Sequence, residues 1–235
     1  MRGTLVAEMD LITKNLIVGA GLPTSPPGLA FQIPGTPEIT FDRLNHIFGE
    51  IAAMFAYRTF QSGPEGESAQ IFGATPHQVV SIQPGLIQVQ EPIELSPEKA
   101  TEKVQRVFSI AAKHLSVTQI LGFGIKWIAH MPINSKDARA FVIDQVYKQS
   151  DQVLEVLGLG GRQWLGMKYV AQDPLGQKQF TVVIEPFLAD ETHLYIDVDA
   201  NFGPGVELGE IKAKADEVLD YIRVPVKQYL EKFGA

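Results

Sequence analysis

The sequence predicts an α+β protein in which a tandem βαβββα repeat forms antiparallel sheet with helices packed on one face. Two observations lead to this prediction. Strands and amphipathic helices follow one another in an order that begins again near the middle of the chain, and several strands alternate apolar and polar residues, as half-buried strands do. With 235 residues, 45% of them hydrophobic, the chain is long enough to bury a large core.

The first half, residues 1–117, is expected to begin with a strand from Leu5 to Val18, bent at Lys14-Asn15. Thr40 is the expected N-cap of a helix, and Ser96, followed by Pro97, marks the start of a second helix. The first helix should place Phe41, Leu44, Phe48, Ile51 and Phe55 on one apolar face. Between the two helices, strands are expected at Ala56–Gln61, Gln70–Ala74, Val79–Gln83 and Leu86–Gln90.

The second half, residues 118–235, repeats this order. A strand is expected at Gln119–His130, and Ser135 should cap a helix that ends before Gly158. The last helix should run from Glu210 to Phe233, with an interruption near Tyr221–Val224 because Pro225 lacks an N–H. Further strands are expected at Gln163–Ala171, Gln179–Phe187 and His193–Ala200.

The two halves also correspond in short stretches of sequence. Val79–Pro84 is similar to Val182–Pro186, and Leu86–Gln90 is similar to Leu194–Val198. The alternative is that any α+β chain places helices after strands. We expect the halves to pack together as one globular unit.

Composition excludes several classes of protein. The chain has no cysteine, which excludes disulfides, thiolate catalysis and cysteine-ligated metal sites. Its net charge is −7 and no basic stripe is visible, so we expect no nucleic-acid partner. No stretch is apolar enough to span a membrane, and the N-terminus lacks the apolar core of a signal peptide. We therefore expect a cytoplasmic protein that does not bind membranes.

The late hairpin is the best candidate for a chemical site. If Gln179–Leu188 pairs with Thr192–Ala200, the hydrophobic pattern selects the register in which paired residue numbers sum to 380. The core side then carries Val182, Ile184, Ile196 and Val198. The other side carries Thr181, Val183, Glu185, Phe187, His193, Tyr195, Asp197 and Asp199.

This polar side has three interpretations. Glu185, His193 and Asp197 are candidate catalytic residues, since neighbouring carboxylates repel and one of them can then serve as a general acid. Asp197, Asp199 and His193 are equally candidate ligands of a divalent metal, although no cofactor is predicted. The third interpretation is a half-exposed sheet whose outer face is simply polar. Among the other histidines, only His130 is expected on the same face.

No catalytic or cofactor motif was found elsewhere. Gly19-Ala-Gly21 lacks the third glycine of a dinucleotide fingerprint, and Gly158–Gly161 follows a helix where a phosphate loop would follow a strand. The chain has no nucleophile elbow, no His-Glu-x-x-His and no P-loop. No cofactor-binding residues are therefore predicted.

Two stretches carry a resemblance to a known family. Gly124–Ile128 combines a small residue, an aliphatic, a basic residue and an aromatic in one strand, and Leu194–Asp199 is an acidic strand before the last helix. In these stretches the chain resembles a sporadically distributed bacterial family of about this length with no assigned function. It departs from that family at Ala129-His130, where the family favours Asn-Arg. The resemblance implies the order of elements and no active site.

Two functions follow as expectations. The first is a binding or interaction module of unknown ligand, with a protein partner or self-association, and with a place as a subunit of a larger assembly. The alternative is a metal-assisted or general acid–base hydrolase that uses the Glu185/His193/Asp197/Asp199 face. The sequence favours the first, because no enzyme motif accompanies the polar hairpin.

Overall fold

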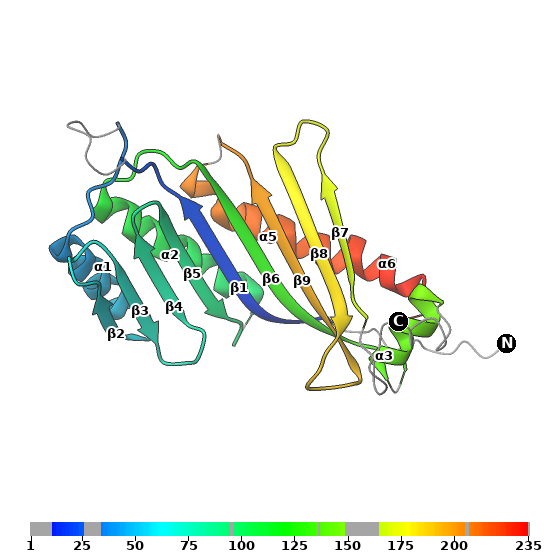
Figure 1. The fold of residues 1–235 in the computed structure, drawn as a ribbon. Helices are drawn as coiled ribbons and strands as arrows, with labels where there is room; N and C mark the ends of the chain where they lie inside the picture. Colours follow the sequence, from blue (N-terminus) through cyan, green and yellow to red (C-terminus); the bar gives the residue numbers. More distant parts are fainter. Residues whose placement is uncertain are drawn as a thin grey trace.

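The computed structural model describes residues 11–25, 34–94, 96–135, 137–148, 165–204 and 207–234, and its strands form one antiparallel sheet (Figure 1). Counted along the chain, the strands pair in the order 2-3-4-5-1-6-9-8-7. The predicted α+β class is confirmed. The nine strands are β1 (Ile12–Gly21), β2 (Tyr57–Ser62), β3 (Ala69–Gly73), β4 (Val79–Gln83), β5 (Leu86–Pro92), β6 (Gly122–Pro132), β7 (Met167–Gln172), β8 (Lys178–Pro186) and β9 (His193–Phe202).

The first strands of the two halves, β1 and β6, pair with each other at the centre of the sheet. Outward from this pair, β5, β4 and β3 lie on one side and β9, β8 and β7 on the other. Strand β2 extends only the first side. The register between β1 and β6 shifts between Thr13 and Asn15, which agrees with the bend expected at Lys14-Asn15. The expected strand residues 5–10 lie outside the described residues.

The helices cover one face of the sheet. Helices α1 (Phe41–Met54), α2 (Pro97–Leu115), α5 (Ile211–Tyr221) and α6 (Lys227–Glu231) lie behind it in Figure 1, and α3 (Ala138–Ala140) lies near one end. No described helix lies on the front. Every second residue of β9 from Leu194 to Phe202 is buried, and the residues between them are partly or fully exposed. One-sided cover thus explains the alternation seen in the sequence.

The two predicted caps of α1 and α2 are confirmed. The Thr40 and Ser96 hydroxyl oxygens each accept a hydrogen bond from the backbone N–H three residues later, at 3.4 and 3.3 Å. The predicted apolar face of α1 is partly wrong. Phe41 is 50% exposed and packs edge-on against Phe60, whereas Ile47, absent from the prediction, is fully buried.

The predicted cap at Ser135 is wrong. The Asp137 carboxylate caps α3, because its Oδ1 accepts hydrogen bonds from the amides of both Arg139 and Ala140. The Ser135 hydroxyl contacts the backbone of Asp137 instead. A π-helical segment, Phe141–Tyr147, follows α3, and the predicted continuation of this helix towards Gly158 lies outside the described residues.

The interruption expected at Pro225 is confirmed. The last helix changes to a π-helical segment, Ile222–Val226, and returns to α-helix at Lys227. Because proline has no N–H, it cannot donate to the carbonyl four residues earlier, and a π-helical turn accommodates the lost bond. Val226 and Leu230 are fully buried, so the chain beyond the proline still packs on the core.

A buried acidic residue fastens α2 to the sheet. Glu91 lies on the helix-facing side of β5, where its carboxylate accepts hydrogen bonds from Lys103 of α2 at 2.5 Å, Tyr57 at 3.2 Å and Gln78 at 3.4 Å. Burial is the main cause that raises the pKa of Glu91 above 4.5, and the hydrogen bond from Lys103 opposes this shift. An ionised Glu91 without Lys103 beside it would destabilise the folded state.

Replacing Lys103 by Met should therefore lower the free energy of unfolding by about 3–5 kcal/mol at neutral pH, because it leaves Glu91 buried without a cation. Because the pKa of Glu91 is raised in the folded state, its ionisation destabilises the fold at neutral pH. This destabilisation disappears below about pH 4.5, where the carboxyl group is protonated in both the folded and the unfolded state. Urea unfolding should accordingly show a smaller loss at about pH 4 than at pH 7. Lys99→Met, at an exposed position of the same helix, is the control. An equal loss at both pH values would contradict the role of Glu91.

Candidate functional site on the open face of the sheet

The register predicted for the late hairpin is confirmed. Ile184 pairs with Ile196 and Glu185 with Tyr195, so paired numbers sum to 380. Val182, Ile184, Ile196 and Val198, which form the predicted core side, are all fully buried. The predicted polar side lies on the face that no described helix covers, which we call the open face.

The acidic residues of β9 face a lysine on the neighbouring strand. Lys126 Nζ of β6 lies 3.0 Å from Asp197 Oδ2 and 3.8 Å from Asp199 Oδ2. Burial raises the pKa of Asp199, Lys126 lowers it, and Asp197 raises it further. The two carboxylates are therefore held by one cation from their own chain.

The histidine of the hairpin turns away from these carboxylates. His193 Nδ1 lies 2.9 Å from the Asp190 carboxylate and 3.0 Å from the Thr192 hydroxyl, both within the connecting loop. Hydrogen bonds from Thr192, with a smaller contribution from His193, lower the pKa of Asp190 to about 2. Glu185 is exposed and lies opposite Tyr195.

The predicted site residues thus share one face without converging. Asp197 and Asp199 meet at Lys126, His193 meets Asp190, and Glu185 lies beside Gly166. Among the residues that the structure describes, no group of three or more His, Asp or Glu side chains is arranged to hold a metal ion. General acid–base chemistry on this face would need these side chains to rearrange.

An aromatic cluster lies at the end of the same strands. The His130 ring of β6 lies 4.0 Å from the Phe187 ring and 6.0 Å from the Tyr195 ring, measured between centroids. Burial, followed by the charges of Lys14 and His193, lowers the pKa of His130 below 6.5, and Asp190 opposes this. The expectation that His130 lies on the same face as His193 is confirmed.

A row of uncharged residues crosses the whole open face. Following the strand pairing from β2 to β7, each member of the row lies opposite the next. No local pattern in the sequence reveals this row, because its members are far apart in the chain. This row, which we call the amide row, consists of Gln61, Gln70, Ser81 and Gln88, then Gly19 and Gly124, and then Asn201, Gln179 and Gln172.

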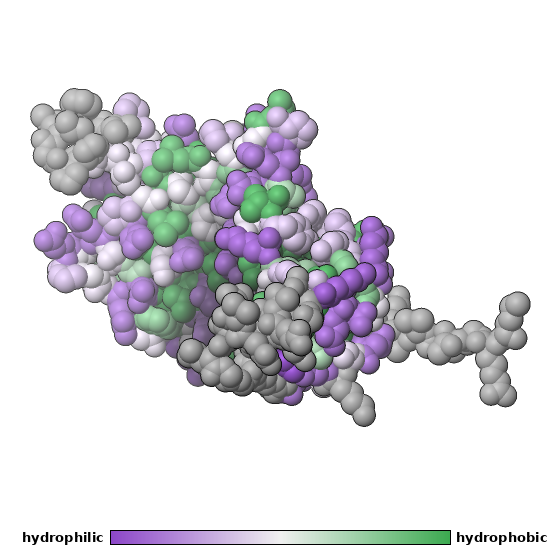
Figure 2. All heavy atoms as spheres, turned by 45° about the vertical axis from the view of Figure 1, so that its right-hand side comes forward, coloured by the Kyte–Doolittle hydropathy of each residue, from purple (hydrophilic) through white to green (hydrophobic). Residues whose placement is uncertain are grey.

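The first four members of this amide row line a hollow. A pocket of about 390 Å³ has a largely polar lining, to which Ser62, Ser68, Gln83 and Leu86 also contribute. In the described part of the chain, the side chains of Gln61, Gln70, Ser81 and Gln88 make no hydrogen bond. Figure 2 shows hydrophilic residues interleaved with hydrophobic ones over the side of the molecule that it displays.

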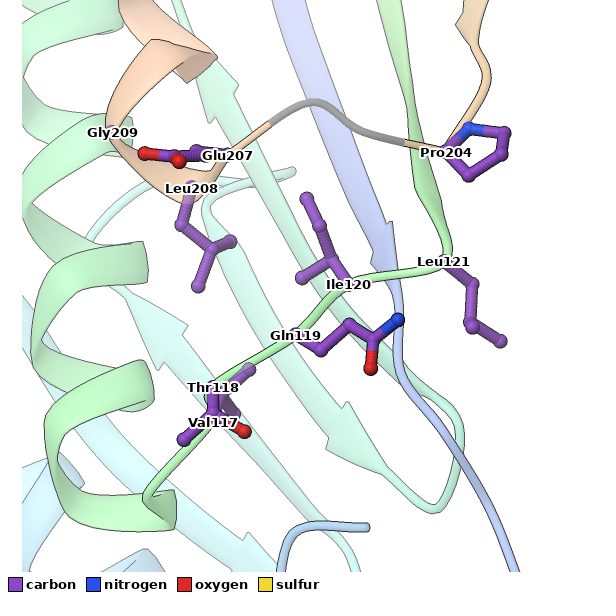
Figure 3. Close-up of a pocket in the computed structure, with 9 residues that line it drawn as sticks. All are labelled: Val117, Thr118, Gln119, Ile120, Leu121, Pro204, Glu207, Leu208 and Gly209. Carbon is purple, nitrogen blue, oxygen red and sulfur yellow. The ribbon is translucent and has the colours of Figure 1, made fainter. Parts of the chain in front are cut away.

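A larger pocket lies elsewhere, between the connection from α2 to β6 and the turn before α5 (Figure 3). It has a volume of about 570 Å³. Ile120 and Leu208 point towards the space between the two segments, whereas Leu121 points away from it. Glu207, its one carboxylate, forms a capping box with Glu210 at the start of the last helix. Besides Glu207, the polar side chains among its described lining residues are those of Thr118 and Gln119.

Comparisons with known proteins assign neither a family nor a function to the chain. No protein-family model and no curated protein matches the chain. No helix in the described ranges is long and apolar enough to cross a membrane.

Replacing Asp197 by Asn should change the free energy of unfolding by less than about 1 kcal/mol, because the ion pair is partly exposed and Lys126 keeps Asp199 as a partner. Thermal unfolding with Mg²⁺, Mn²⁺ or Zn²⁺, each compared with a chelator, should be the same for variant and wild type. A metal-dependent rise in the melting temperature of the wild type that Asp197→Asn abolishes would instead support the hydrolase.

Replacing Phe187 by Ala should raise the pKa of His130 towards 6.5, because burial is the main cause of its depression. The pKa can be measured from the ring-proton shifts in NMR spectra recorded against pH. Leu188→Ala, at the exposed neighbouring position, is the control and should leave the titration unchanged. Because the folded state disfavours the charged imidazole, the contribution of His130 to stability is present above 6.5 and is lost below it. An unchanged titration in Phe187→Ala would contradict this account.

Proposed function

We propose that the protein is a binding module whose open sheet face receives the ligand. The observation that carries this proposal is the amide row, which crosses all nine strands on the face that no described helix covers. Its glutamines and serine have donors and acceptors that no other described residue uses. Such groups are available to a ligand without breaking any contact of the folded chain.

The contacts of the predicted hydrolase residues favour binding over hydrolysis. A general acid or metal site requires carboxylates and imidazole to converge on one reacting group. Here Lys126 already pairs with both Asp197 and Asp199, and His193 is paired within its own loop. A hydrolase would need these pairs to open first.

A protein partner or a second copy of the chain is the other candidate ligand. Its support is the aromatic cluster of His130, Phe187 and Tyr195, since aromatic side chains contribute strongly to protein interfaces. Leu188, which is 72% exposed, lies beside this cluster in sequence and adds apolar surface. This candidate would occupy the β6–β9–β8 half of the open face.

We also propose that the two halves, residues 1–117 and 118–235, are copies of one βαβββα unit. The strand order supports this, because β1-β5-β4-β3 and β6-β9-β8-β7 run outward from the centre with equivalent positions along the chain. In this alignment β2 is an additional strand of the first half. The amide row then draws on both copies, with Gly19 and Gly124 at equivalent places.

The natural absence of cysteine makes the binding proposal directly testable with single-site labels. Ser81→Cys reports on the hollow on the β2–β5 side of the open face. Thr181→Cys reports on the other side, which contains Lys126 and Asp199. Each variant carries an environment-sensitive fluorophore and is titrated with panels of oligosaccharides and of peptides. We expect a saturable change in emission at one of these two labels.

The control is the same label at Ser109→Cys, on the exposed side of α2. It should not respond to a ligand that binds the open face. An absence of response from both open-face labels to every panel, or an equal response from the Ser109 label, would overturn the proposal.

A further inference from the structure

The centre of the amide row contains two glycines that the backbone does not require. Gly19 and Gly124 lie opposite each other in β1 and β6, and neither has a positive φ angle. Glycine in the interior of a strand weakens the sheet and often marks close approach of a ligand or another backbone. Since backbone conformation does not require glycine at these positions, close approach of a ligand offers a reason for it.

The surroundings of the two glycines accommodate one more carbon atom. A Cβ atom at Gly19 would have the Leu86 side chain as its nearest neighbour, at 3.5 Å, which is ordinary van der Waals contact. A Cβ atom at Gly124 would meet the flexible Asn201 carboxamide at 3.3 Å. A Cβ atom thus fits at Gly19 and needs only a small movement of Asn201 at Gly124, so packing does not require glycine at either position. The glycines leave the surface of the row lower at its middle.

The row carries no formal charge along its entire length, although the next row does. That neighbouring row places Lys126 and Asp199 side by side, and these two form an ion pair with each other. A charged ligand over the amide row would lose hydration without gaining an opposite charge, which is unfavourable. The ligand that matches the amide row is uncharged.

The amides also indicate the polar chemistry of that ligand. Each carboxamide offers two donors and one acceptor group, so it can pair with a hydroxyl in either direction. Neighbouring strands are about 4.8 Å apart, so Gln61 and Gln70 lie one strand spacing apart and Gln88 follows beyond Ser81. An extended peptide, by contrast, usually adds to the edge of a sheet through its backbone.

An apolar strip runs beside the amides. Phe72, Val79 and Ile17 belong to the neighbouring row on β3, β4 and β1, with Gln90 between the last two. Leu86 borders the hollow on the other side. A ligand with hydroxyl groups at its edges and C–H groups on its faces would contact both kinds of surface.

We infer that the amide row binds a neutral oligosaccharide that lies across the strands, over Gly19 and Gly124 and into the hollow between Gln61 and Gln88. This inference rests on the proposed function and names the ligand class. The glycine pair provides close approach for the sugar rings, and the unpaired amides of Gln70 and Gln88 provide hydrogen bonds to their hydroxyls.

The test is isothermal titration calorimetry of the intact chain with the neutral hexasaccharides of cellulose, starch and chitin. A hexamer of galacturonic acid serves as the charged probe. We expect at least one neutral hexasaccharide to bind and the charged one not to bind. Gly19→Ala adds one methyl group, which fits beside Leu86, at the middle of the row. It should weaken binding roughly tenfold while the melting temperature stays equal or rises, because alanine is less costly than glycine inside a strand.

Gln88→Leu is the second variant, and it leaves both glycines unchanged. Loss of its hydrogen bonds should weaken binding roughly tenfold. Gln228→Leu, at an exposed position of α6 on the other side of the sheet, is the matched control and should change the affinity by less than about twofold. If both row variants bind as the wild type does, the proposed location is wrong.

The outcomes separate the ligand class from the binding function. If no neutral hexasaccharide binds while the Ser81 label responds to peptides, the oligosaccharide is wrong and the binding module stands. If neither oligosaccharides nor peptides affect the open-face labels, both proposals fail. Tighter binding of the uronic acid hexamer than of every neutral hexamer would overturn the argument from charge.

Discussion

The pairing of β1 with β6 is the interaction on which the rest of the structure depends. It joins the strands of the first half to those of the second, so that nine strands form one sheet. The helices of both halves then cover a continuous surface on the same face. Without this pair, each half would expose a central strand edge, which tends to associate with other chains. The same pair places Gly19 opposite Gly124, at the middle of the open face.

Because helices cover only one face of the sheet, the two faces carry different kinds of side chain. Side chains that face the helices are buried and apolar, with the Glu91 cluster as an exception held by Lys103, Tyr57 and Gln78. Side chains on the open face are partly exposed, and polar residues lie there beside apolar ones such as Phe72 and Ile17. Such a face binds ligands well where its polar groups have no partner inside the protein, which is the case for Gln70 and Gln88.

The two halves of the open face differ in electrostatics, and this difference separates their proposed roles. On the β6–β9 side, the charged residues Asp197 and Asp199 share one cation of the same chain, Lys126. On the β2–β5 side, the amide row is neutral and its side chains are free of such pairs. Paired charges beside aromatic rings are suited to contact with a protein partner, whereas unpaired amides are suited to a ligand rich in hydroxyl groups.

Local patterns in the sequence determined the elements and much of their detail. Alternation specified which side of β9 is buried and fixed its register with β8, because a shift by one residue would have placed Asp197 in the core. Ser96 with Pro97 and the internal Pro225 specified one helix start and one interruption through backbone hydrogen bonding alone. The tertiary structure decided which distant residues meet: Lys126 with Asp197, Lys103 with Glu91, and Gln61 with Gln70, Ser81 and Gln88 along one row. A local pattern tells each strand which side faces the core, but the order of the strands in the sheet depends on packing between segments far apart in the chain, and that order creates the site.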